Sequence, residues 1–227
     1  MPPGGPVITQ REFSMALRIK AGAKAMTATV VNLRQGRFLF TARHGIESYP
    51  QNPIELFYHG SWHRVDVDPV ENPDFDYDVV AARISDTVSD QPFNETLSSG
   101  DLTASQEVYF LGFPLGLTGD SPVGFPIPIA LVKRGILSGF AGAGAKRILF
   151  IDAMNTKGFS GGPVFASNPR GPGLALAGIV AKYHHREAKF PAEINGVVGT
   201  VTIEENVGIT IAYPVQGVVE SIIRKYG

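Results

Sequence analysis

Short runs of β-prone residues, separated by turn residues, fill most of this chain and limit what it can fold into. The 227 residues include 26 glycines and 17 prolines, scattered along the whole length. Residues 28–33 and 37–41 are two such runs, and the turn between them contains Gly36, which predicts a hairpin. Similar runs follow at 54–58, 63–67, 78–84, 107–111, 130–138, 148–151, 162–165, 175–182 and 208–212. This pattern is typical of antiparallel sandwiches and barrels, so it predicts an all-β fold.

One segment, at the C-terminal end, has the periodicity of a helix. Its apolar residues recur at the spacing of a single helix face: Val215, Val218, Val219, Ile222, Ile223 and Tyr226. Pro214 suits the first turn, where its missing N–H would have no partner. A small, polar stretch at 97–101 divides the rest of the chain. We therefore expect one barrel over about 14–98, a second over about 101–213, and a helix over 214–226.

The composition excludes several classes of function. Lys and Arg number 20 against 21 Asp and Glu, for a net charge of -1, and no basic stripe is present, so neither nucleic acid nor a membrane is an expected partner. The absence of cysteine excludes disulfides, thiolate metal sites and a cysteine nucleophile. No signal-peptide pattern and no apolar run of about 20 residues is found. We expect a cytoplasmic protein. If an export signal has been removed from the sequence, a periplasmic or secreted protein is expected instead.

Residues 157–164, Lys-Gly-Phe-Ser-Gly-Gly-Pro-Val, are the most informative segment. A serine hydroxyl is a weak nucleophile at neutral pH, so a serine enzyme needs a base, and it needs donors for the oxyanion that forms on attack. Glycines beside Ser160 would let backbone N–H groups converge on one point. On its own, such a segment is more often an ordinary turn before a strand.

Two residues upstream favour the catalytic interpretation. His44 follows the apolar strand 38–40, and Asp78 begins the apolar run 79–84, although Asp74 and Asp76 are close alternatives to Asp78. The chain order of histidine, aspartate and serine is that of the chymotrypsin-type arrangement. The three residues are far enough apart for the first two to lie on one barrel and Ser160 on the other.

These segments resemble the trypsin-like peptidase family, and most of all the protease domain of its HtrA branch. Residues 40–44 resemble the family's Leu-Thr-Ala-x-His block, and residues 76–84 are similar to its Asp-x-Ala-x-Leu-x-Ile block. Residues 151–163 resemble the nucleophile block with no change in length. Weaker blocks at 111–117, 134–138 and 178–180 follow the family's order.

The resemblance implies two antiparallel six-stranded β-barrels, the chymotrypsin fold, with the active site between them and a C-terminal helix. It assigns His44, Asp78 and Ser160 to the catalytic triad and the N–H groups of Gly158 and Ser160 to the oxyanion hole. It also places Met154 at the base of the primary specificity pocket and Val180 at its wall. The segment 178–182, which includes Gly178, Ile179 and Val180, is then expected to be the edge strand that pairs with the substrate.

The sequence departs from the family's pattern in two places. Phe159 stands where the HtrA branch has asparagine and trypsin has aspartate, so the ion pair that activates zymogens cannot form and activation by N-terminal clipping is not expected. Phe159 also leaves open a flipped Gly158 peptide and an unformed oxyanion hole at rest. No segment like a PDZ domain follows the second barrel.

The expected function is that of a serine endopeptidase that cleaves after small or medium apolar residues through an acyl-enzyme, with no metal and no other cofactor. The expected partner is a protein or peptide substrate, with an activating protein or a homo-oligomer left open. His184 and His185 begin a charged stretch to about Asn206, for which a surface loop or hairpin is favoured over a metal site. Two alternatives remain: a catalytically silent trypsin-like module that binds a peptide or scaffolds an assembly, and an esterase that uses the same three residues.

Overall fold

The computed structural model describes residues 6–47, 49, 53–70, 78–85, 96–121 and 125–227. The alternatives Asp74 and Asp76 lie outside these residues. None of the described helices is both long and apolar enough to cross a membrane. A short helix, α1 (Gln10–Phe13), precedes the first strand and is capped by Thr9.

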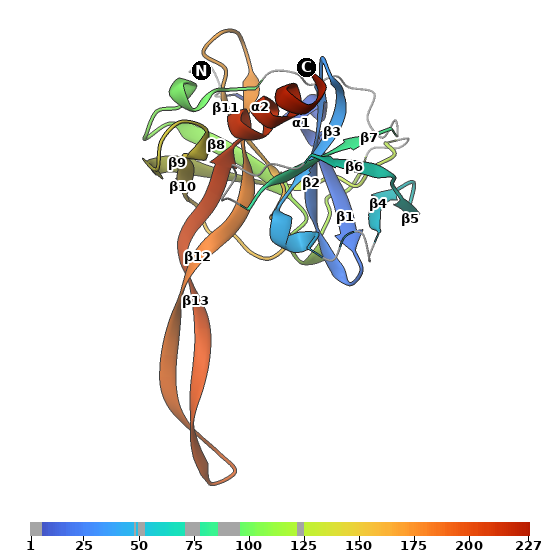
Figure 1. Ribbon diagram of the computed structural model, residues 1–227. Helices are drawn as coiled ribbons and strands as arrows, with labels where there is room; N and C mark the ends of the chain where they lie inside the picture. Colours follow the sequence, from blue (N-terminus) through green and yellow to red (C-terminus); the bar gives the residue numbers. More distant parts are fainter. Residues whose placement is uncertain (1–5, 48, 50–52, 71–77, 86–95, 122–124) are drawn as a thin grey trace.

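The N-terminal half is one antiparallel sheet of seven described strands in the order β5-β4-β1-β2-β3-β7-β6 (Figure 1). The strands are β1 (Ala16–Ala21), β2 (Lys24–Leu33), β3 (Gly36–Thr41), β4 (Ile54–Tyr58), β5 (Ser61–Arg64), β6 (Val67–Val70) and β7 (Val80–Ile84). Apolar side chains from β1 to β4 fill its interior, among them Leu17, Ile19, Val30, Leu39 and Ile54. A 3-10 turn, η1 (Arg43–Gly45), follows β3.

The C-terminal half is a closed six-stranded barrel in the order β10-β13-β12-β11-β8-β9. Its strands are β8 (Glu107–Gly112), β9 (Leu131–Ala141), β10 (Ile148–Asp152), β11 (Pro163–Ser167), β12 (Leu174–Ile194) and β13 (Val197–Pro214). Three further 3-10 turns lie in this half, η2 (Ser99–Asp101), η3 (Pro114–Gly116) and η4 (Gly144–Lys146). A second core of buried residues, including Val108, Leu137, Leu149, Val164 and Ala177, fills this barrel.

The expected all-β, two-barrel fold with a C-terminal helix is confirmed, with one difference in strand number. The N-terminal sheet has seven paired strands where six were expected, and strand pairing does not close it within the described residues. Two strands were not among the runs expected from the sequence: β1, and β6, which contains Pro69. Proline is tolerated there because β6 lies at the edge of the sheet, next to β7 alone.

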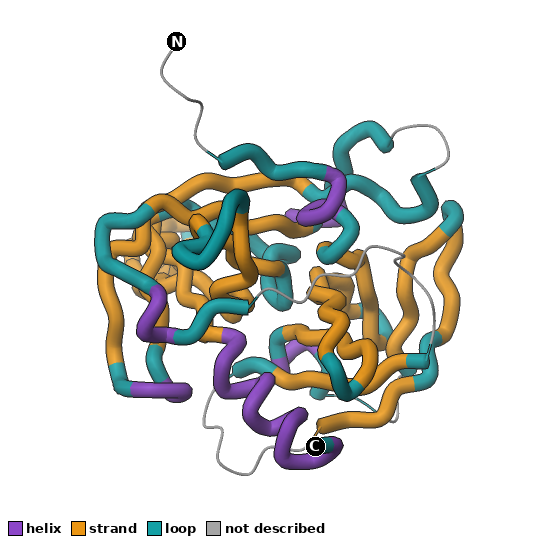
Figure 2. The backbone as a smooth tube through the Cα atoms, turned by 90° about the horizontal axis from the view of Figure 1, so that it is seen from above, coloured by secondary structure: helices purple, strands orange, loops and turns teal. Residues whose placement is uncertain are grey.

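The C-terminal helix α2 (Val215–Tyr226) lies along the side where the two halves meet, as Figures 1 and 2 show from two directions. It starts after Pro214, which is its N-cap residue. Val215, Val218 and Ile222 are buried in a core cluster that also contains Phe38 of β3 and Leu176 of β12. The helix therefore packs against strands of both halves.

Strands β12 and β13 continue far beyond the barrel as a two-stranded arm (Figure 1). Pairing runs without interruption from His185 opposite Asn206 to Ile194 opposite Val197. The tip is Asn195-Gly196, with φ angles of 53° and 78°, the backbone conformation of the type I′ turns that match the twist of a hairpin. The charged stretch that begins at His184 and His185 is thus a hairpin.

Candidate active site

His44 and Asp78 are held together by two hydrogen bonds. The ring nitrogen Nδ1 of His44 lies 2.5 Å from Oδ2 of Asp78, and the backbone N–H of His44 donates to Oδ1 at 2.8 Å. The strand pairing explains the contact, since η1 follows β3, Asp78 precedes β7, and Thr41 of β3 pairs with Val80 of β7. Two residues that are distant in sequence therefore meet at the same end of neighbouring strands.

Asp78 sets the electrostatics of this pair. The hydrogen bond that His44 donates to Asp78 raises the pKa of His44 above its usual 6.5, against an opposing effect of burial. The side chain of Asp78 is 22% exposed and that of His44 is 44% exposed. In a neutral ring, an Nδ1–H that donates to the carboxylate leaves the lone pair on Nε2. The imidazole is thus arranged to accept a proton at Nε2.

The turn that carries Ser160 joins β10 to β11 and packs against the N-terminal half. The carbonyl oxygen of Ser160 accepts a hydrogen bond of 3.1 Å from the N–H of Thr27 in β2, and Gly161 N–H donates to the Val180 carbonyl at 2.7 Å. Gly161 has a φ of +86°, and a Cβ there would lie 1.9 Å from the Thr27 carbonyl oxygen. Only glycine fits this position, which explains the glycine after the serine.

Thr27, which no sequence pattern singled out, supports the turn around Ser160 from the other half of the molecule. Its buried hydroxyl donates to the Gly158 carbonyl at 2.6 Å and accepts from the N–H of Phe113 at 3.1 Å. Thr29, also fully buried, donates to the Gly161 carbonyl at 2.8 Å. A buried hydroxyl needs a partner, so two threonines spaced by two in an otherwise apolar strand were the available signal.

The backbone N–H groups of Gly158 and Ser160 donate to no acceptor within the described part of the chain. The carbonyls on both sides of Gly158 are occupied, because Lys157 accepts from the N–H of Leu115 at 3.0 Å and Gly158 accepts from Thr27. A peptide N–H points away from the carbonyl of its own peptide unit, so the bond to Lys157 also sets the direction of the Gly158 N–H. Gly158 has a φ of +107°, and a Cβ there would lie 2.2 Å from the Phe113 carbonyl oxygen.

Phe159 anchors the same turn by burial instead of an ion pair. Its side chain is fully buried in the core of the second barrel. Its ring packs edge-on against Phe110, with centroids 5.3 Å apart, and Gly112 leaves room for it, since a Cβ there would lie 2.6 Å from the Phe159 ring. Hydrophobic packing holds the position that an aspartate occupies in trypsin.

Within the described residues, no hydrogen bond joins the Ser160 hydroxyl to His44. The structure therefore brings His44 and Asp78 into contact, while it holds Ser160 through its backbone at the junction of the two halves. In enzymes of this type the bond between nucleophile and base commonly shortens only when substrate is bound.

The structure corrects the expected substrate strand. Gly178 and Ile179 pair with β11 on one side and β13 on the other. Both the N–H and the carbonyl of Val180 bind the turn that carries Ser160 (residues 157–162, the nucleophile turn). All three residues are buried, with no backbone edge free for a substrate. Because β11 ends its pairing at Ile179, the open edge of β12 begins at Ala181.

Met154 also differs from its expected place. It is 58% exposed, so it does not form the base of a closed pocket. Its backbone carbonyl accepts a hydrogen bond of 2.6 Å from Lys133 Nζ, which fixes the loop while the thioether faces outward. Within the described residues, no group of three His, Cys, Asp or Glu side chains is arranged to hold a metal ion.

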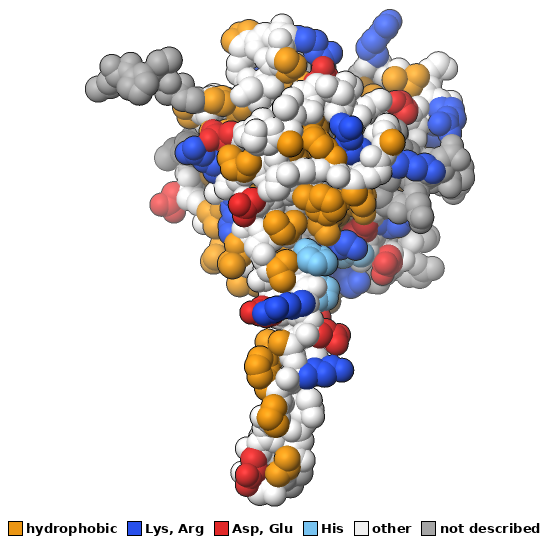
Figure 3. Space-filling view, turned by 90° about the vertical axis from the view of Figure 1, so that its left-hand side faces the viewer, with side chains coloured by type: hydrophobic (Ala, Val, Ile, Leu, Met, Phe, Trp, Pro, Cys, Tyr) orange, Lys and Arg blue, Asp and Glu red, His pale blue; other side chains and the backbone are white. Residues whose placement is uncertain are grey.

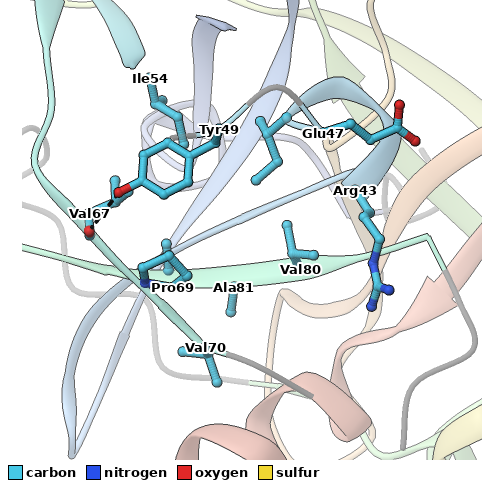
Figure 4. A pocket seen from close by; sticks show the side chains of 11 residues that line it. Arg43, Glu47, Tyr49, Ile54, Val67, Pro69, Val70, Val80 and Ala81 are labelled. Atoms are coloured by element: carbon cyan, nitrogen blue, oxygen red, sulfur yellow. Dashed lines mark hydrogen bonds between the residues drawn. The ribbon is translucent and has the colours of Figure 1, made fainter. Parts of the chain in front are cut away.

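A cavity of about 540 Å³ opens in the N-terminal half beside η1 (Figure 4). Its lining is mostly apolar, and Arg43 and Glu47 lie at one side of it. The Tyr49 hydroxyl donates to the Val67 carbonyl at 3.3 Å across another part of the lining. None of His44, Asp78 and Ser160 lines this cavity, so it is separate from the candidate active site.

Comparison with solved structures finds the same fold in several proteases. The HtrA-type protease AlgW, solved with a tripeptide, is similar over 92% of this chain, at 18% sequence identity and a TM-score of 0.58. This chain covers 59% of AlgW. Deg5 is similar over 93% of this chain and 88% of its own, at 17% identity and a TM-score of 0.58. The MamO protease domain from Magnetospirillum magneticum is similar over 94% and 98%, at 17% identity and a TM-score of 0.55.

Among curated proteins, no sequence match was found. The model of the trypsin-like peptidase domain matches residues 26–172, which is more than half of the chain and includes His44, Asp78 and Ser160. This match, together with the two-barrel fold, shows that the chain belongs to the family of trypsin-like peptidase domains.

Proposed function

We propose that this protein is a serine endopeptidase that uses Ser160 as nucleophile, His44 as general base and Asp78 as the residue that orients His44. The observation that carries the proposal is the bond of 2.5 Å between His44 Nδ1 and Asp78 Oδ2, which leaves Nε2 free to accept a proton. The second support is the turn around Ser160, where two N–H groups lack acceptors within the described residues.

The reaction follows from these roles. His44 Nε2 takes the proton of the Ser160 hydroxyl as its oxygen attacks the carbonyl carbon of a peptide bond. His44 then gives this proton to the leaving amine, and an acyl-enzyme remains on Ser160. Water attacks the ester and loses a proton to His44, which returns it to the Ser160 oxygen as the acyl–oxygen bond breaks and the acid product leaves. Asp78 stays ionised throughout and stabilises the imidazolium.

The oxyanion of the intermediate needs donors that are already in place. We assign this role to the N–H groups of Gly158 and Ser160, whose turn is fixed by Thr27, Leu115 and the burial of Phe159. Removing one such donor typically lowers the rate about 10²–10³-fold. A hole built in advance avoids the cost of reorganising the turn during the reaction.

We propose that the substrate binds as an added strand on the open edge of β12, beginning at Ala181. AlgW has been solved with a tripeptide and with a decapeptide, which is in keeping with a peptide ligand. Cleavage after small or medium apolar residues is proposed from the apolar residue types at Met154 and Val180 in the family's pattern, since the Val180 side chain itself is fully buried in the barrel core. A peptide library should show cleavage mainly after Val, Leu or Ala, and dominant cleavage after Arg, Lys or Glu would contradict this specificity.

Hydrolysis of denatured casein, followed by mass spectrometry of the products, tests the proposed function. The wild-type protein should release peptides with new termini, and a Ser160→Ala protein should release none. Turnover of short-chain esters with no cleavage of casein would instead favour the esterase. If neither substrate is turned over by the folded wild-type protein, the silent peptide-binding module is the correct assignment.

A further inference from the structure

The arm formed by β12 and β13 has one apolar and one polar face. Paired residues lie on the same face of a two-stranded ribbon, and successive residues alternate between faces. One face therefore carries Ala188 opposite Ile203, Phe190 opposite Val201, and Ala192 opposite Gly199. The other face is mostly polar and carries Glu187, Lys189, Glu193, Thr200, Thr202 and Glu204, together with Pro191 and the exposed Val198. In the middle part of the arm, Figure 3 shows hydrophobic side chains on one side and charged ones on the other.

Nothing in the described part of the chain covers the apolar face. Phe190 is 52% exposed and Ile203 is 49% exposed. A single two-stranded hairpin is only marginally stable in water, and a face of this kind normally packs against something. A third strand at the edge of the arm would lie beside this face and extend it. Its own apolar side chains would then lie next to Ala188 and Phe190 on the apolar face.

A third strand could be added at either edge of the arm, and the two edges differ in which part of the barrel they continue into. A strand added beside β13 would run into β10, which already pairs with β13 from Asp152 to Leu149. The β12 edge, in contrast, is open from Ala181 outward, and it adjoins Val180, whose backbone binds Gly161 and Gly162 of the nucleophile turn. A chain on the β12 edge is thus led directly to Ser160.

The base of the arm is fixed to the active-site loops. Asn206 Nδ2 donates to the carbonyl of Asn155 at 2.5 Å, and Ala153 N–H donates to the carbonyl of Gly208 at 3.0 Å. Asn155 is buried, and its own Oδ1 accepts from Thr156 N–H at 2.7 Å. These bonds give the arm a set direction relative to the residues that precede Ser160.

Two other occupants of the apolar face fit less well. Residues 184–206 hold two Lys or Arg against four Glu, so an anionic membrane surface would repel the arm. A second copy packed face to face would cover too little area. A face roughly 35 Å long and 10 Å wide gives about 700 Å² for two copies, whereas stable interfaces bury about 1,200–2,000 Å².

We propose that the arm extends the substrate-binding site. An unfolded polypeptide with alternating apolar residues adds as an antiparallel strand along the β12 edge between Phe190 and Ala181, because Pro191 has no N–H with which to continue the pairing toward the tip. Because β12 runs from the barrel toward the tip, an antiparallel substrate places the residues that precede the scissile bond along the arm. The substrate is therefore a long extended segment, bound over about ten residues upstream of the cut. This inference rests on the proposed function.

Peptide substrates of graded length test the inference. They share the sequence around the scissile bond and carry 4, 8 or 12 upstream residues of alternating apolar and polar type, and a matched set is extended downstream. For the wild-type protein, kcat/KM should rise at least 10-fold with upstream length and stay level with downstream length. No dependence on upstream length would overturn the proposal.

A variant with a shortened arm is the matched control protein for this series of peptides. Deletion of residues 187–194 and 197–204 leaves Arg186, Asn195, Gly196 and Glu205 in sequence, and since Arg186 already pairs with Glu205, the tip turn and the register are kept. This protein should cleave the four-residue substrate like wild type and lose the gain with upstream length. Retention of the gain in the shortened protein would contradict the inference.

A binding measurement separates this inference from the proposed function. In a Ser160→Ala background, fluorescence anisotropy of the labelled 12-residue upstream peptide should show binding at least 10-fold weaker after Phe190→Ser, with Thr202→Ala on the polar face as the control without effect. Equal binding in all three proteins would overturn the inference even if wild-type protein hydrolyses casein. Analytical ultracentrifugation that finds a dimer in wild type and a monomer in the shortened protein would assign the face to a second copy instead.

Discussion

At the residue scale, the contact between His44 and Asp78 controls the protonation of the proposed base. The hydrogen bond that His44 donates to Asp78 raises the pKa of His44 above its usual value, and the base acts only when the ring is neutral. Activity should therefore fall as the pH drops through this raised pKa. The carboxylate also holds Nδ1 protonated, which is the tautomer that the mechanism needs.

Asp78→Asn should lower kcat by about 10⁴-fold, because the amide stabilises the wrong tautomer. The remaining activity should have its acidic limb at lower pH than wild type, since the main cause of the raised pKa of His44 is removed. A pH profile of kcat/KM on a short peptide measures both effects. Asp152→Asn, an exposed carboxylate at the end of β10, is the control and should change neither. A profile for Asp78→Asn that overlays wild type would exclude Asp78 from the proposed role.

Thr27→Val should lower kcat about 10–10²-fold with little change in KM, because the Gly158 carbonyl loses its donor and the oxyanion turn is less well held. The Gly158 carbonyl and the Phe113 N–H both lose their partner, which should lower the free energy of unfolding by about 1–3 kcal/mol. Thr29→Val removes an equally buried hydroxyl that binds Gly161, and it should cost similar stability with a smaller effect on kcat. Equal kcat losses in the two variants would show that Thr27 acts on stability alone.

The sequence identified the candidate catalytic residues, but it did not identify the residues that hold them in position. Motifs at 40–44 and 157–163 sufficed to single out His44 and Ser160 as candidates. Thr27 escaped notice because its partners, Gly158 and Phe113, are distant in sequence and meet it only when the two halves pack. The outward position of Met154 likewise depends on how Lys133 holds the loop, which no local pattern encodes.

At the scale of elements, the nucleophile turn is stabilised by a buried aromatic ring. Phe159 lies in the core of the second barrel, with Phe110 against its ring and Gly112 beside it. This arrangement needs no new N-terminus, so the turn is held without proteolytic processing. Its integrity depends on core packing instead of a salt bridge.

Phe159→Ala should lower the free energy of unfolding by about 3–5 kcal/mol, since it removes a fully buried ring and leaves a cavity. Phe190→Ala, at a half-exposed ring on the arm, is the control, and a change within about 0.5 kcal/mol is expected there. Urea denaturation followed by tryptophan fluorescence measures both. A loss below 1 kcal/mol for Phe159→Ala would mean that the turn is anchored elsewhere.

Most elements of regular pattern could be predicted, although β1, with its alternation from Leu17 to Lys20, was not among the expected strands. The hairpin around Gly36 is found as β2 and β3, because apolar alternation and a turn residue agree there. The edge strand β6 was missed because Pro69 argues against a strand unless its edge position is known. The open edge of β12 was misplaced by about three residues, because only the fold shows where β11 stops pairing.

At the scale of the whole molecule, α2 links the two halves on which the site depends. Its buried face joins the core shared by β3 and β12, and near its end Lys225 Nζ lies 2.9 Å from Oδ1 of Asp68. The Tyr226 hydroxyl donates to Oδ2 of the same aspartate at 2.6 Å. His44 and Asp78 belong to one half and Ser160 to the other. The helix therefore helps to fix the positions of the three residues relative to one another.

Ile222→Ala should lower the free energy of unfolding by about 2–5 kcal/mol, because Ile222 is fully buried between the halves. Its neighbour Ile223 is 50% exposed, and Ile223→Ala should have little effect. Thermal unfolding by circular dichroism compares the two variants directly. Equal melting temperatures for the two variants would contradict the linking role of the helix.

The two-barrel architecture as a whole was predictable, because motif order and strand-rich composition agree with one family. The long arm was not, since the sequence of residues 184–206 suits a loop as well as a hairpin when nothing shows what lies beside it. Its meaning becomes visible only with the fold, where the open edge of β12 continues from the nucleophile turn.

Labelling with a fluorophosphonate probe, with the modified residue mapped by mass spectrometry, tests the central claim most directly. We expect a single adduct on Ser160, formed by wild-type protein and lost in Ser160→Ala and His44→Ala. Folded wild-type protein that takes up no probe, or that carries it on another serine, would contradict the assignment of Ser160 as nucleophile.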